Sequence, residues 1–184
     1  MNKFYTSTGD DGFSGLLGEG RVPKWHPRIE LVGKIDEATS SLGLARSFCK
    51  APESGPLLLD IQRDLYHMMA ECAATLENAH RFRVIDETKV ETIENQINSI
   101  SSKVHNPEGF IVPGDSPAGA ALAVARTVIR NAERHLAKLW LDGEIENQNL
   151  LKYLNRLSSL CFVLELLEND VAGKGTTTYA KTDL

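Results

Sequence analysis

Apolar side chains recur at spacings of three and four residues through most of the chain, which is the period of an amphipathic helix. Five stretches follow this pattern: 27–49, 56–76, 86–105, 117–141 and 147–171. The third stretch is polar between its apolar positions, so we expect it to lie at the periphery of the fold. Strand patterns are weak, and the short connections favour antiparallel neighbours. The sequence therefore predicts an all-α fold, an antiparallel five-helix bundle in residues 27–172 with a tail at 173–184.

The segment before the first predicted helix, residues 5–24, shows neither helical nor strand periodicity. It holds five of the chain's 14 glycines, begins with hydroxyl side chains and ends on Lys24. Glycine lets a ligand approach the backbone closely, and successive amides in such a loop can hold an anion. The segment is either a phosphate-binding loop or a flexible N-terminal tail, and composition alone favours the tail. Its glycine spacing matches neither the P-loop nor the dinucleotide fingerprint.

The bulk composition narrows the class of protein. At 184 residues we expect a single domain, 1–184. The net charge of −5 argues against nucleic acid as a partner. Three cysteines, far apart and odd in number, favour free thiols in a reducing compartment. The sequence shows no signal peptide and no apolar run of about 20 residues, so we expect a cytoplasmic protein without a membrane partner.

Three arginines in the fourth predicted helix, Arg126, Arg130 and Arg134, lie on successive turns of one face. A charged stripe is usually a solvated helix face. Residues 122–129 are mostly apolar, however, and arginines on a buried helix need partners. Asp36 in the first helix is a candidate partner for Arg126, either in a structural ion pair or in orienting that arginine at a site.

Two further residues, Asn155 and Phe110, are candidates for either a structural or a functional role. Asn155 lies inside the apolar last helix, where it can bond across a helix interface or contact an adenine or a ribose. Phe110 opens a short apolar stretch before the turn at Pro113 and Gly114. From the residues alone, Phe110 is interpreted as an ordinary core side chain.

Several motifs, in one order along the chain, resemble the ATP:corrinoid adenosyltransferases of the propanediol-utilisation type. They cover Tyr5 to about Leu164 and keep the family's approximate spacing. The motifs are Thr6-Ser7-Thr8-Gly9-Asp10-Asp11-Gly12, Gly20-Arg21-Val22-Pro23-Lys24, Pro27-Arg28, Gly33-x-x-Asp36-Glu37, Phe110-Ile111-Val112-Pro113-Gly114, Ala125-Arg126-Thr127, Arg130-x-Ala132-Glu133-Arg134 and Tyr153-Leu154-Asn155-Arg156-Leu157-Ser158.

The resemblance implies a helical bundle that assembles as a homotrimer with active sites between subunits. It implies transfer of the 5′-deoxyadenosyl group of ATP to reduced cob(I)alamin, which gives adenosylcobalamin and triphosphate. Mg²⁺ would accompany ATP, with no protein residue assigned as its direct ligand. A corrinoid reductase and an adenosylcobalamin-dependent enzyme are the protein partners that the resemblance implies.

The resemblance also implies roles for individual residues. Asp36 would pair with Arg126 across the subunit interface, and Phe110 would close the lower face of the corrin and displace its dimethylbenzimidazole ligand. The residues expected to contact ATP are Thr6, Ser7, Thr8, Gly9, Ser14 and Lys24 in the loop, and Arg130, Glu133, Arg134 and Asn155 in the helices.

The chain departs from the family's usual residues at five positions: Ser7, Asp11, Thr39, Asp115 and Asn131. The changes at Ser7 and Asp11 remove positive charge near the expected phosphates. They motivate an alternative function on the same scaffold, that of a nucleotide- or corrinoid-binding carrier or regulator with weak or no catalysis.

Overall fold

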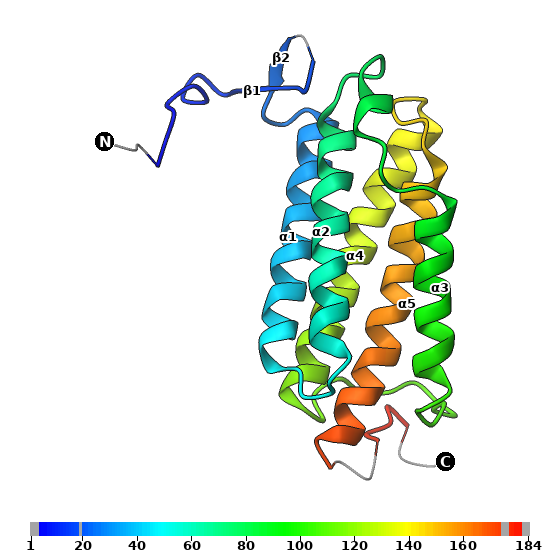
Figure 1. Ribbon diagram of the computed structural model, residues 1–184. Helices are drawn as coiled ribbons and strands as arrows, with labels where there is room; N and C mark the ends of the chain where they lie inside the picture. Colours follow the sequence, from blue (N-terminus) through cyan, green and yellow to red (C-terminus); the bar gives the residue numbers. More distant parts are fainter. Residues whose placement is uncertain (1–3, 19, 174–176, 182–184) are drawn as a thin grey trace.

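The computed structural model describes residues 4–18, 20–173 and 177–181. Within these ranges the helices are α1 (Pro27–Phe48), α2 (Ser54–Ala73), α3 (Glu87–Ser101), α4 (Pro117–Leu141) and α5 (Gln148–Val171). A hairpin of β1 (Phe13–Gly15) and β2 (Arg21–Pro23) precedes them, and a 3-10 turn, η1 (Ala79–Phe82), follows α2. Successive helices run in alternating directions along one bundle (Figure 1). The predicted five-helix, all-α fold is confirmed.

Helix α4 is the central element of the bundle. It packs against both α1 and α5, while α2 packs on α1 and α3 packs on α5. Aliphatic side chains from these helices, such as Ile35, Leu65, Leu122 and Leu157, are fully buried in one continuous core. Helix α3 contributes only Val90, Ile93 and Ile100 as buried residues, as expected for a peripheral helix.

The helix ends follow local capping chemistry. The Ser116 hydroxyl accepts from the Gly119 amide at the start of α4, and Pro117 occupies the first turn, where its missing N–H costs nothing. Helix α2 differs from the sequence prediction at both ends, because it begins at Ser54 and ends at Ala73. Leu76, predicted to line its buried side, is 44% exposed.

Helix α2 ends early because backbone groups at its end form hydrogen bonds with the N-terminal hairpin. The amide of Leu17 donates to the carbonyl of Ala73, and the amide of Thr75 donates to the carbonyl of Leu17. These bonds join the N-terminal hairpin to the end of α2. The sequence pattern did not predict the hairpin, because strands of three residues are too short to show an alternating period.

Arg28, in the first turn of α1, also contacts the end of α2, through hydrogen bonds from its buried side chain. It is 4% exposed, and its Nη1 atom donates to the carbonyls of Ala74 at 2.7 Å and Cys72 at 3.3 Å. Its Nη2 atom donates to the carbonyl of Glu144, which follows α4, and its Nε atom faces the Glu144 carboxylate at 3.4 Å. One buried guanidinium therefore joins the start of α1, the end of α2 and the segment after α4.

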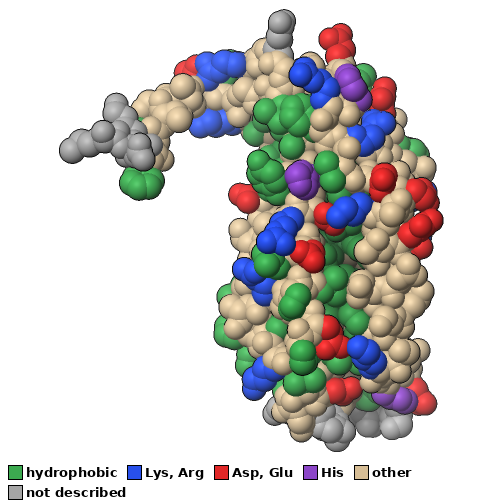
Figure 2. Space-filling view, viewed as in Figure 1, with side chains coloured by type: hydrophobic (Ala, Val, Ile, Leu, Met, Phe, Trp, Pro, Cys, Tyr) green, Lys and Arg blue, Asp and Glu red, His purple; other side chains and the backbone are tan. Residues whose placement is uncertain are grey.

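The hairpin and residues 4–12 before it lie at one end of the bundle and project sideways from it (Figure 1; Figure 2). The segment between α3 and α4, and residues 177–181, lie at the opposite end. In the described part of the chain the three cysteines are free, as expected. No helix among the described residues is long and apolar enough to cross a membrane.

We expect Arg28→Met to lower the free energy of unfolding by about 2–4 kcal/mol, because two buried carbonyls lose their donor. Urea denaturation followed by circular dichroism measures the change. Arg63→Met is the matched control. Arg63 is exposed and, within the described ranges, its ion-pair partner is Asp60, so its loss should change stability by less than about 0.5 kcal/mol. Equal effects of the two substitutions would contradict the role given to Arg28.

Candidate active site

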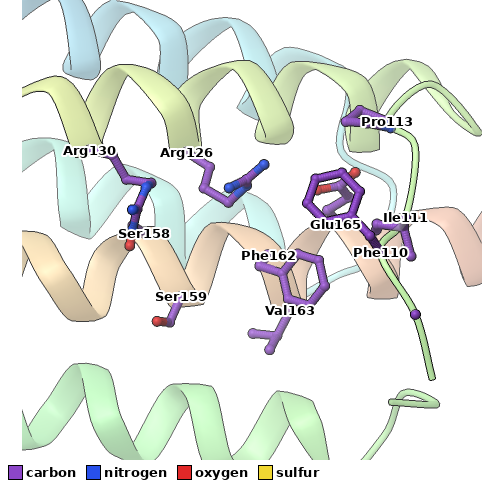
Figure 3. Close-up of a pocket in the computed structure, with 11 residues that line it drawn as sticks. Phe110, Ile111, Pro113, Arg126, Arg130, Ser158, Ser159, Phe162, Val163 and Glu165 are labelled. Atoms are coloured by element: carbon purple, nitrogen blue, oxygen red, sulfur yellow. The ribbon is translucent and has the colours of Figure 1, made fainter. Parts of the chain in front are cut away.

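A pocket of about 390 Å³ opens between α4, α5 and the segment that precedes α4. Phe110, Ile111 and Pro113 form one wall, Arg126 and Arg130 extend from α4, and α5 forms the floor (Figure 3). The α5 side chains that line it are Ser158, Ser159, Phe162, Val163 and Glu165. Apolar walls with two guanidinium groups suit a large, mostly apolar ligand that carries acceptor groups at its edge.

Phe110 is not a core residue, so the interpretation from the residues alone is wrong. Its side chain is 76% exposed at the pocket. The neighbouring Ile111, by contrast, is only 7% exposed. An aromatic ring held out at the mouth of a pocket is available to contact a ligand.

The three arginines of α4 differ in environment. Arg126 is half-buried, whereas Arg130 and Arg134 are exposed. The Nε atom of Arg126 is buried and has no hydrogen-bond partner in the described part of the chain. The expectation of a buried arginine that needs a partner therefore holds for Arg126 alone.

Glu165 faces the same pocket and was missed by sequence reasoning. It is 1% exposed, and its Oε1 atom has no hydrogen-bond partner among the described residues. Burial raises the pKa of the Glu165 carboxyl to about 7; Arg126 opposes the shift and Asp115 adds to it. The available signal was a glutamate flanked by leucines in an apolar helix, which is an expensive place for a charge.

Farther along α4 and α5, Asn155 makes the cross-helix bond that was one of its two alternatives. Its Nδ2 atom donates to Oε1 of Glu133 at 2.8 Å, and its Oδ1 atom accepts from Nη1 of Arg156. Arg156 in turn pairs with Glu94 on α3 at 2.8 Å. Two predicted ATP contacts, Glu133 and Asn155, are thus held in fixed positions by one chain of polar contacts. The nucleotide contact of Asn155 stays a prediction.

The predicted loop contacts gather around the hairpin. The Lys24 ammonium lies over Gly9, so closely that a Cβ on Gly9 would come within 3.1 Å of it. The hydroxyls of Thr6 and Thr8 are 2.9 Å apart, and Ser14 lies in β1 opposite Val22. Ser7 has a φ of 57°, the left-handed conformation found in anion-binding nests.

Arg21 organises this loop, a role the sequence reasoning did not give it. Its guanidinium binds both carboxylate oxygens of Asp11, at 2.7 and 2.8 Å, and donates to the carbonyls of Thr8 and Phe13. These hydrogen bonds from Arg21 lower the pKa of the Asp11 carboxyl. The acidic residue at position 11 is therefore an internal partner of Arg21.

The site residues form two separate groups in one chain. Asp36 is exposed on α1 and makes no ion pair within the described ranges, so its predicted pairing with Arg126 across an interface stays a prediction. Residues 6–18 and 20–24 make no described hydrogen bond to α4 or α5. The hairpin that carries the loop residues and the segment before α4 that carries Phe110 lie at opposite ends of the bundle (Figure 1).

We expect the stability of the protein to fall as the pH rises toward 8. The folded-state pKa of Glu165 is raised from 4.5 to about 7, so the folded state binds a proton that the unfolded state has released. The resulting stability is fully present below about pH 4 and is lost as the pH rises through about 7, a change on the order of 3 kcal/mol.

Glu165→Gln should remove this pH dependence and stabilise the protein at about pH 8, because the amide carries no charge to bury. Urea denaturation between about pH 5 and pH 8 measures both effects. Glu37→Gln, at an exposed position of α1, is the control and should keep the wild-type profile. Identical profiles for wild type and Glu165→Gln would contradict the account of Glu165.

The chain is similar in sequence to cobalamin and corrinoid adenosyltransferases. The cobalamin adenosyltransferase family matches residues 4–168. The corrinoid adenosyltransferase PduO of Citrobacter freundii is 36% identical over 166 residues, which are 90% of this chain and 49% of that protein. The corrinoid adenosyltransferase of Bacillus subtilis is 35% identical over 184 residues, 98% of this chain and 93% of that protein. The chain spans about half the length of the PduO relatives from Citrobacter freundii and Salmonella typhimurium.

The fold is similar to solved structures as well. A variant of the PduO-type ATP:corrinoid adenosyltransferase from Lactobacillus reuteri, complexed with cobalamin and ATP, superposes with a TM-score of 0.89 at 28% identity. The match covers 98% of this chain and 97% of that one. A second variant from the same organism, complexed with ATP, gives a TM-score of 0.86 over 97% of this chain. On these matches, the chain belongs to the PduO-type cobalamin adenosyltransferase family.

Proposed function

We propose that this protein transfers the 5′-deoxyadenosyl group of ATP to cob(I)alamin. The observation that carries the proposal is the exposed Phe110 at a pocket that also presents Arg126 and Arg130. The pocket combines an apolar surface for a corrin ring with cationic groups beside it. The ligands named for the Lactobacillus reuteri structure, cobalamin and ATP, support this assignment.

The reaction needs no activated side chain as nucleophile. Co(I) attacks C5′ of ATP, a Co–C bond forms, the C5′–O bond breaks, and triphosphate leaves with the bonding electrons. Cobalt is thereby oxidised formally to Co(III). The protein must hold C5′ in line with cobalt and stabilise charge on the leaving triphosphate, which are tasks of positioning and electrostatics.

Each group of residues then has a role in the proposal. The loop residues Thr6, Ser7, Thr8, Gly9, Ser14 and Lys24 bind the triphosphate. Arg130, Glu133, Arg134 and Asn155 hold the rest of the nucleotide. Phe110 covers the lower face of the corrin and keeps a lower ligand off cobalt, which requires only apolar bulk on a fixed segment.

Mg²⁺ fits this site as a companion of the triphosphate. The described residues contain no group of three or more acidic, histidine or cysteine side chains that could hold a metal. Mg²⁺ is commonly bound through one or two carboxylates together with substrate phosphates. Glu133 is the carboxylate among the proposed ATP contacts, and the metal would supply charge neutralisation at the phosphates.

The proposal includes a homotrimer with sites between subunits. The sideways projection of the loop from its own bundle supports this arrangement (Figure 1). The exposed carboxylate of Asp36 and the half-buried guanidinium of Arg126 carry opposite charges, and different subunits can bring them together. The loop of one subunit would then face the α4–α5 surface of the next.

We expect the purified protein, incubated anaerobically with ATP, Mg²⁺ and chemically reduced cobalamin, to produce the absorbance spectrum of adenosylcobalamin. Arg130→Ala should lower the rate by about 100-fold, because charge on the leaving triphosphate loses a stabilising donor. Arg63→Ala, at an exposed position of α2, is the control and should retain the wild-type rate. Binding of ATP or corrinoid by calorimetry without product would contradict the proposal and indicate a carrier.

A further inference from the structure

The segment that carries Phe110 is paired with the C-terminal segment, defined here as residues 177–181. The amide of Val112 donates to the carbonyl of Thr178, and the amide of Ala180 donates to the carbonyl of Phe110, each at 2.8 Å. Ile111 and Tyr179 form an antiparallel bridge between these two bonds. Residues from the far end of the sequence therefore hold the backbone of Phe110.

Asp115 fixes the C-terminal segment from the other side. Its Oδ2 atom accepts from the Thr178 amide at 3.0 Å, and its Oδ1 atom accepts from the Thr178 hydroxyl at 2.6 Å. Both carboxylate oxygens thus bind one residue. Thr178 also binds Val112, so the same residue contacts the Phe110 segment and Asp115.

Hydrogen bonds at the start of α4 hold the backbone next to Asp115. It directly precedes Ser116, the N-cap of α4, whose hydroxyl accepts from the Gly119 amide at 2.9 Å. The Ser116 hydroxyl also lies 2.6 Å from Oδ1 of Asn169 on α5. A continuous set of contacts therefore runs from the packed ends of α4 and α5 through Asp115 and Thr178 to the backbone of Phe110.

Phe110 needs such a support because its own side chain provides little. With the ring 76% exposed, packing of the ring cannot fix the backbone that carries it. Gly114 lies between this segment and Asp115 and has a φ of +131°. Because glycine has no Cβ, it restrains the backbone little at this turn. The bonds to residues 177–181 supply the restraint that the glycine does not.

We propose that Asp115 is a positioning residue for Phe110, acting through Thr178 and the C-terminal segment. The inference rests on the proposed function, since it concerns the ring that covers the corrin. Asp115 touches neither substrate in this proposal. It determines how firmly the ring is held at the pocket, and so how completely the ring keeps a lower ligand off cobalt.

The test uses Thr178→Val and Asp115→Ala in the full chain. Thr178 lies on the surface, so a valine of similar shape removes the hydroxyl bond and leaves the core unchanged. We expect kcat for adenosyl transfer to fall by about 10- to 100-fold in Asp115→Ala, less in Thr178→Val, with KM for ATP unchanged. Thr92→Val is the control and should match wild type, because the Thr92 hydroxyl donates to the Thr88 carbonyl within its own helix.

A spectroscopic measurement separates positioning from mere structural support. With ATP, Mg²⁺ and cob(II)alamin, the corrin absorbance reports the fraction of cofactor that has lost its lower ligand. Asp115→Ala should lower this fraction, and in the Phe110→Ala background it should cause no further change, because the residue acts through the ring. Asp115→Asn, which keeps an acceptor for Thr178, should restore part of the loss.

Two results would overturn the inference in distinguishable ways. Wild-type transfer and wild-type spectra in both Asp115→Ala and Thr178→Val would show that the contact does not position Phe110, while the proposed function stands. Additive losses in the Phe110→Ala background would show that Asp115 acts elsewhere. Absence of transfer by the wild-type protein would overturn the proposed function and this inference together.

Discussion

The close packing of α4 between α1 and α5 is the constraint on which the rest of the structure depends. Small residues on α4, including Ala118, Gly119, Ala125 and Ala132, are buried where the helix meets its neighbours. A Cβ added to Gly119 would collide with the side-chain amide of Asn169. Because the helices approach so closely, Arg126 is half-buried at the α4–α5 pocket, while Arg130 and Arg134, one and two turns away, reach solvent. The same packing supports the segment that carries Phe110.

Three of the five departures from the family's usual residues have internal side-chain partners in this structure. Asp11 binds Arg21, Asp115 binds Thr178, and Asn131 accepts a hydrogen bond from Arg134 at 3.4 Å. The acidic residue in the loop therefore belongs to a bidentate ion pair that shapes the loop. This ion pair restrains the loop, and a restrained loop favours ligand binding by lowering the cost of ordering.

The helices could be predicted from the sequence because their signals are local. Apolar periodicity, proline in the first turn and Ser116 or Asp86 as caps act over a few residues. The hairpin could not be predicted, since its three-residue strands depend on backbone bonds to Ala73 and Thr75. The pairing of Phe110 with residues 177–181 depends on contacts between distant segments, which periodicity does not contain. The sequence alone predicts a core position for Phe110, because an apolar residue in an apolar stretch gives no sign of its exposure.

The central proposal is that the hairpin loop of one subunit and the α4–α5 surface of another form the active site together. Subunit complementation tests it most directly. Lys24→Ala and Asn155→Ala, each inactive alone, are co-expressed with different tags, and the mixed oligomers are assayed for adenosyl transfer. Random mixing pairs an intact loop with an intact helix surface in about a quarter of the sites, so about a quarter of the wild-type activity should return. No recovery in verified mixed oligomers would place the whole site within one chain and contradict the account.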